Sequence, residues 1–181
     1  MESGLQARHT YDHPYLTPPS ADRKDLGAFY PMMSHGANIP VVEVNPATGL
    51  VRVLRYIAVH DVGTIVNRRS LRASGITPGM GMALFEEVVY DKQGQPLTSS
   101  FMDYLLPTAM EVPRFEIGQV ETPSPFTEYG FKAGGEGGRM IAPAALASAV
   151  EDALAPLGVR VEELAMARER IVDWIEARRR G

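Results

Sequence analysis

One apolar stripe near the end of the chain limits the possible folds more than any other feature. Between residues 142 and 156, apolar side chains recur at the i, i+3, i+4 spacing of a single helix face. Pro143 suits the first turn of such a helix, and Gly158 suits its stop. The apolar positions are Leu146, Ala149, Val150, Ala153, Leu154 and Leu157. We therefore predict an amphipathic helix over 142–156, whose apolar face other elements must cover.

The rest of the chain predicts the elements that could cover the apolar face of this helix. Residues 39–59 predict a β-hairpin, because β-branched runs flank a Pro/Gly turn signal at 45–49. Residues 117–121 predict another strand, and Phe85 to Tyr90 predict either a strand or the end of a short helix. A last amphipathic helix is predicted over 167–179.

Together these elements predict an α/β fold of the α+β type. We expect a mixed, mainly antiparallel sheet with helices packed on it. Residues 1–38 are rich in Pro, Tyr, His and Met and lack periodicity, so they predict an irregular N-terminal arm. Residues 39–181 then form one domain, which suits a chain of 181 residues.

Composition excludes several classes of function. The chain has no cysteine, so it holds no disulfide, thiolate nucleophile or cysteine-ligated iron–sulfur cluster of its own. A net charge of −4 does not favour a nucleic-acid partner. No apolar run approaches the roughly 20 residues that span a bilayer, so no membrane partner is expected. The first residues lack a signal-peptide core, and a cytoplasmic location is the expectation.

Three groups of motifs, taken in order, resemble one enzyme family. They are 41–49 with Asp61-Val62-Gly63, then 79–87 with 100–108, and then 121–125 with 132–138 and 142–145. Each motif is weak alone, but their order and spacing resemble the large subunits of molybdenum hydroxylases. These enzymes include xanthine dehydrogenase, aldehyde oxidoreductase and carbon monoxide dehydrogenase. The resemblance implies a fold like their molybdenum-cofactor-binding domain. It covers the last portion of a longer subunit, which forms one wall of the cofactor and substrate site.

The resemblance implies that Glu136 is the catalytic residue. In the family, the Glu of a Gly-x-Gly-Glu segment is the general base next to molybdenum, and an ionisable side chain suits that task. This chain has Ala133 at the first glycine of the segment, whereas Gly135 and Glu136 match. Gly134 and Gly135 would let the backbone approach a bulky cofactor, and Lys132 would help to orient the segment. The plainer alternative is a solvated glutamate in a flexible loop.

A second set of expected cofactor contacts departs from the family's pattern. Gly79 and Gly81 predict a turn whose backbone N–H groups face phosphate or pterin oxygens. The family has a Gln where this chain has Pro78, and Pro supplies neither an amide side chain nor an N–H. The family's Glu-Gly-Gln segment is also shortened and altered at 72–75. A degenerate loop that binds the cofactor poorly is therefore as reasonable as retained binding.

Histidines do not predict a metal site of the protein's own. His9 and His13 are four residues apart, but Pro14 argues against a helix there and no third ligand lies nearby. We therefore predict no metal ligands among the side chains, and structural roles for His35 and His60.

The resemblance also implies cofactors and partners. The cofactor would be molybdopterin with molybdenum, in its cytosine dinucleotide form, shared with a larger molybdopterin-binding chain. FAD and 2Fe-2S clusters would reside only in partner subunits. Three hypotheses remain open: a catalytic piece of a split hydroxylase acting on an aldehyde or N-heterocycle, a non-catalytic assembly subunit, or an isolated fragment without independent function.

Overall fold

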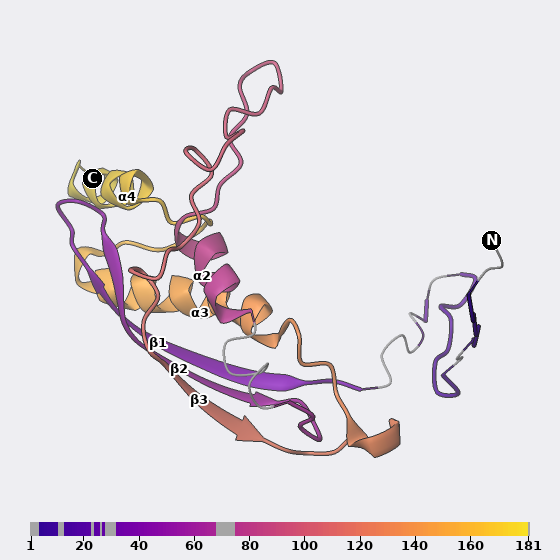
Figure 1. Ribbon diagram of the computed structural model, residues 1–181. Helices are drawn as coiled ribbons and strands as arrows, with labels where there is room; N and C mark the ends of the chain where they lie inside the picture. Colours follow the sequence, from indigo (N-terminus) through magenta and orange to yellow (C-terminus); the bar gives the residue numbers. More distant parts are fainter. Residues whose placement is uncertain are drawn as a thin grey trace.

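A three-stranded mixed sheet forms the base of the domain (Figure 1). The computed structural model describes residues 4–10, 13–22, 24–25, 27, 32–67 and 75–180. The strands are β1 (His35–Val44), β2 (Val51–Asp61) and β3 (Phe115–Val120). The order is β1-β2-β3, with β1 antiparallel and β3 parallel to β2. The predicted α+β fold with a mixed sheet is confirmed.

The predicted hairpin is present, and its turn is built by its own polar groups. The amide of Asn45 donates to the carbonyl oxygen of Leu50 at 2.9 Å, and the Asn45 side chain accepts the amide of Ala47 at 2.9 Å. Gly49 has a left-handed φ of 65°, which favours glycine. Strand β1 begins at His35, so residues 35–38, which were expected in the irregular arm, belong to the sheet.

Helix α3 (Gly137–Leu154) covers one face of the sheet. Its buried positions include Leu146, Val150 and Leu154, as the apolar stripe predicted. The helix starts five residues earlier than expected, and Pro143 lies inside it instead of in the first turn. The glycines that precede the apolar stripe hid this start, because glycine has low intrinsic helix propensity.

Helix α2 (Ile76–Leu84) was not predicted, because its glycines indicated turns. Tertiary packing overrides their low propensity. A Cβ atom added at Gly79 would lie 2.7 Å from the Cβ of Ala142 in α3. The absence of a side chain at Gly79 therefore lets α2 and α3 pack closely on the same side of the sheet.

The C-terminal elements complete the core at the hairpin end of the sheet. The short helix η2 (Ala155–Leu157) ends at Gly158, whose φ is 69°. Helix α4 (Arg168–Arg180) then buries Ile171 and Ile175, close to the predicted range of 167–179. The largest fully buried side chains are Tyr56, Ile76, Met80, Leu146, Val150, Leu154, Met166, Ile171 and Ile175. The domain therefore has one core between the sheet, α2, α3 and α4.

A long excursion separates α2 from β3. Helix α2 ends at Leu84, and residues 86–89 form no strand. The chain turns back at Asp91, whose carbonyl oxygen accepts the amide of Gly94 at 3.1 Å. We call residues 86–114 the excursion. Its middle part projects away from the body of the domain (Figure 1), whereas Glu86 and Pro107 lie close to Gly81 of α2. The short helix η1 (Glu128–Gly130) follows β3.

Helix α3 together with η2 is the one described segment, Gly137–Leu157, that is long and apolar enough to cross a membrane. The sequence-based expectation that no apolar run approaches this length was therefore too strong. Core helices of soluble proteins meet the same criterion. The buried side of this one packs against β1 and α2, and we interpret it as a core helix.

Candidate functional site

Glu136 stands at the start of α3, on the surface of the chain. It occupies the N-cap position, and its carbonyl oxygen accepts the amide N–H of Met140 at 2.9 Å. The side chain is exposed and makes no hydrogen bond that caps the helix. Its carboxylate is therefore available to a group that approaches the beginning of α3.

The backbone around Glu136 borders open space. A Cβ atom added at Gly135 or Gly137 would meet no other atom within 4 Å, apart from the neighbouring residues. The first turn of α3 contains no acidic side chain, and the first amides of a helix have no acceptor within it. The helix start therefore presents N–H donors and the positive end of the helix dipole to an anionic or polar group.

A buried ion pair lies just before this loop. The Nζ of Lys132 donates to Asp61 Oδ2 at 2.7 Å and to Thr122 Oγ1 at 2.6 Å. The Thr122 hydroxyl in turn donates to Asp61 Oδ2. The side chains of Asp61 and Lys132 are each only 11% exposed. These three residues, which we call the Asp61 cluster, join the end of β2 to the segment that leads into the Glu136 loop.

Backbone contacts reinforce the Asp61 cluster. Asp61 Oδ1 accepts the amide of Gly63 at 3.0 Å, and the amide of Lys132 donates to the carbonyl oxygen of Val62 at 3.0 Å. Gly63 has a left-handed φ of 64°, and a Cβ there would lie 2.2 Å from the carbonyl oxygen of Gly130. Glycine is therefore required at position 63, both for its conformation and for this close approach.

Opposing effects act on the pKa of Asp61. Burial raises it, whereas hydrogen bonds from the side chains of Lys132 and Thr122 and from the amide of Gly63 lower it. The hydrogen bonds prevail and hold the pKa well below its ordinary value of 3.8. Asp61 is therefore charged at neutral pH and forms a full ion pair with Lys132.

The structure shows what holds Lys132. It was expected to orient the glycine-rich segment and to bind the cofactor. In the structure its ammonium group is engaged by Asp61 and Thr122 within the chain, and its contact with a cofactor stays a prediction. Asp61 and Thr122 were not predicted as site residues at all. The available signal was the Asp-x-Gly motif at the end of a strand, since Asp61 binds the amide of Gly63 two residues on.

The predicted turn at Gly79 and Gly81 is wrong in its geometry. Both glycines are buried inside α2, and the amide of Gly79 donates to the carbonyl oxygen of Gly75 at 2.9 Å. A Cβ at Gly81 would collide with the carboxylate of Glu86. These glycines allow close packing, and their contact with a cofactor stays a prediction.

The departures from the family pattern next to these glycines are Pro78 and segment 72–75, and the structure describes only part of them. Pro78 is exposed in the first turn of α2, where a missing N–H does not break the helix. Of the altered segment 72–75, only Gly75 is described; 72–74 lie outside the described residues.

The described histidines do not form a shared metal site. The Nε2 of His13 lies 3.1 Å from the carbonyl oxygen of Phe126, and His60 is buried with its Nε2 3.3 Å from Asn38 Oδ1. Burial lowers the pKa of His60. Within the described part of the chain, no three His, Asp or Glu side chains lie together as a possible metal site.

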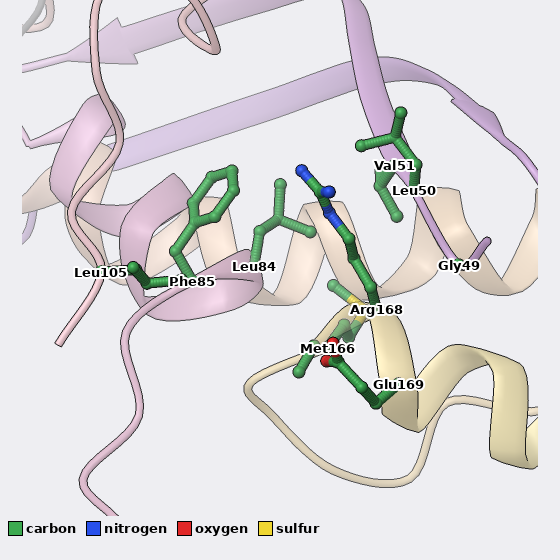
Figure 2. Close-up of a pocket in the computed structure, with 10 residues that line it drawn as sticks. Gly49, Leu50, Val51, Leu84, Phe85, Leu105, Met166, Arg168 and Glu169 are labelled. Carbon is green, nitrogen blue, oxygen red and sulfur yellow. The ribbon is translucent and has the colours of Figure 1, made fainter. Parts of the chain in front are cut away.

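Two of the concave regions on the described surface are relevant to the site. One, of about 280 Å³, lies between the hairpin turn, the end of α2 and the start of α4. Figure 2 shows the side chain of Arg168 there among Leu50, Val51 and Leu84. None of the predicted site residues lines it. The other, of about 340 Å³, includes Thr122 and Lys132 of the Asp61 cluster in its wall.

The family of the chain follows from its relatives. Residues 1–113 match the molybdopterin cofactor-binding domain family. The chain belongs to this family. The nicotine 6-hydroxylase large subunit of Paenarthrobacter nicotinovorans is 43% identical over 145 residues, which are 78% of this chain and 18% of that subunit. The carbon monoxide dehydrogenase large chain of Hydrogenophaga pseudoflava is 35% identical over 88% of this chain and 18% of its own.

Solved structures agree with the sequence relatives. The quinoline 2-oxidoreductase of Pseudomonas putida 86 matches with a TM-score of 0.76 and 40% identity, over 79% of this chain and 19% of that one. The predicted resemblance to molybdenum hydroxylases is confirmed. This molybdopterin cofactor-binding domain spans about a fifth of the length of the relatives it matches.

The surroundings of Glu136 fit a molybdopterin cofactor. The space beside Gly135 and Gly137 admits a bulky group, and the start of α3 offers amide donors for its oxygens. In this domain, Gly134, Gly135 and the first turn of α3 would hold the cofactor. Glu136 would lie beside it. Lys132 would anchor the loop from behind, where Asp61 and Thr122 hold its ammonium group.

Proposed function

We propose that this domain forms one wall of the molybdenum site in a molybdopterin-dependent hydroxylase that acts on an aldehyde or an N-heterocycle. Membership of the family supports the cofactor. Two relatives carry names that specify N-heterocycles, nicotine and quinoline, which supports that substrate class. When bound, the molybdenum cofactor supplies the redox chemistry of the reaction.

The observation that carries the proposal is the position of Glu136. An uncommitted carboxylate stands at the open start of α3, next to glycines that leave room for a cofactor. Glu136 then serves as the general base and accepts a proton during hydroxylation of the substrate. A base has to lie within hydrogen-bond reach of the proton that it takes. The exposed carboxylate at the start of α3 is accessible to a bound cofactor and substrate.

Partners complete the site. We infer that a larger molybdopterin-binding chain supplies the remaining wall and that iron–sulfur and flavin subunits carry electrons away. The relatives' names describe subunits of larger assemblies. We further propose that the cofactor is the cytosine dinucleotide form.

Exposed apolar surface supports a large partner. The excursion exposes Phe101 by 80%, Met102 by 89% and Met110 by 90%. On the sheet face opposite α3, Ile39 and Val41 are also exposed. Apolar patches of this kind mark interaction surfaces.

A second candidate function is a non-catalytic assembly subunit. Pro78 favours it, because it presents no amide side chain at an exposed position in the first turn of α2. A domain that lost this contact could keep its partner surfaces and no longer hold the cofactor.

Affinity purification of the tagged chain from its natural host separates these functions. We expect a larger molybdopterin-binding chain to co-purify, with molybdenum measured by mass spectrometry and pterin measured by fluorescence after oxidation. A stable partner without metal or pterin would support the assembly subunit instead. A chain recovered alone would contradict both functions. It would support the third hypothesis, an isolated fragment without independent function.

A further inference from the structure

The Glu136 loop is fixed at both of its ends. On one side, Lys132 is held by Asp61, Thr122 and the carbonyl oxygen of Val62. On the other side, Gly138 is buried at the start of α3, and Ala142 is fully buried one turn further on. Residues 133–137 therefore span two fixed points.

Between these points, side-chain packing does little to fix the path of the chain. Ala133, Gly135 and Glu136 are exposed, and added Cβ atoms at Gly135 and Gly137 would meet nothing. Glycine also has the largest conformational freedom of any residue. Side-chain packing within the loop therefore does not fix the direction in which Glu136 leaves the domain, and the two anchors help to set it.

The two anchors differ in kind. The α3 anchor is apolar packing that the whole core shares. The anchor at Lys132 is a local polar cluster in which a buried ammonium is neutralised by one carboxylate. Because it joins three segments through few bonds, its removal should loosen the loop more than the core.

We propose that Asp61, Thr122 and Lys132 are positioning residues that hold the loop so that Glu136 faces the cofactor. Asp61 and Thr122 act through Lys132 and touch neither cofactor nor substrate. This inference rests on the proposed function of Glu136 for its catalytic consequence. The tethering of the loop can be measured independently of catalysis.

Three variants in the purified assembly test it. Asp61→Asn removes the charge, and Thr122→Val removes the hydroxyl at similar size. Thr122→Ser keeps the hydroxyl and removes only the methyl group. The matched control is Glu87→Gln, which weakens an ion pair of equal length, 2.7 Å to Arg170, at helix α4. The readouts are amide hydrogen exchange over residues 131–138, together with kcat and KM.

For Asp61→Asn and Thr122→Val, we expect exchange in the loop to rise about tenfold or more. We also expect kcat to fall, on the order of 100-fold for Asp61→Asn, because small misplacements of a catalytic group are costly. KM should stay within about twofold, since uniform binding is not affected. Thr122→Ser should behave as the wild type, and Glu87→Gln should change neither readout.

Wild-type loop exchange and wild-type kcat in folded Asp61→Asn would overturn the proposal. If Asp61→Asn does not fold, Thr122→Val decides, because it keeps the ion pair. A Glu136→Gln variant in the same assay separates the general-base function of Glu136 from the tethering of the loop by the Asp61 cluster. If it retains turnover, the function of Glu136 is wrong, whereas the exchange data still decide whether the Asp61 cluster tethers the loop.

Discussion

Replacing Glu136 with Gln should lower the turnover of the assembled enzyme by about 10²- to 10⁴-fold, the range contributed by a positioned general base. Gln keeps the size and polarity of the side chain but cannot accept the proton. The exposed position at the start of α3 makes a folding defect unexpected. The measurement is kcat per molybdenum, so that loss of cofactor is not mistaken for loss of chemistry.

The matched control for this change is Glu128→Gln. Glu128 is also an exposed glutamate, in the short helix η1 eight residues earlier. It should retain full kcat at equal molybdenum content. Full turnover in Glu136→Gln would show that another group accepts the proton.

Replacing Asp61 with Asn should lower the free energy of unfolding by about 3 kcal/mol at pH 7, the lower end of the range for breaking a buried ion pair from one side. The reason is that the Lys132 ammonium stays buried without its counter-charge. Asn still accepts hydrogen bonds, which keeps the loss at that lower end. Chemical denaturation of both proteins measures the difference.

The sign of the pH dependence follows from the lowered pKa of Asp61. A carboxylate whose pKa is lower in the folded state stabilises the fold above its unfolded pKa, near 3.8, and loses this effect as pH falls toward its folded value. The difference between wild type and Asp61→Asn should therefore be constant from about pH 5 to 8 and shrink in stronger acid. Glu116→Gln, which weakens the exposed pair with Arg55, should cost much less. An equal loss in both variants would contradict a special role for the buried pair.

Much of the fold could be predicted because its signals are local. The hairpin turn at Asn45–Gly49 and the stripe of Leu146, Val150 and Leu154 each specify an element within a few residues. Helix α2 was missed because its glycines have poor helix propensity, and only the approach of Ala142 from α3 explains them. That contact joins residues 63 positions apart, which no local pattern reveals.

The candidate site also combines features that local sequence signals predict with features that only long-range contacts create. Glu136 could be proposed from the glycine-rich motif around it, and the structure places it at the accessible start of α3. The partnership of Asp61 with Lys132 spans 71 positions and depends on the end of β2 meeting the segment after β3. Lys132 could therefore be proposed from its own motif, whereas its partner Asp61 could not.

The most direct test of the proposed role of Glu136 is a cryo-electron-microscopy structure of the assembly purified with this chain, in which the Glu136 carboxylate is located. We expect Glu136 to line the pocket that holds the pterin-bound molybdenum, with a second polypeptide forming the opposite wall. A structure in which this side chain faces bulk solvent, with the cofactor bound elsewhere, would contradict it.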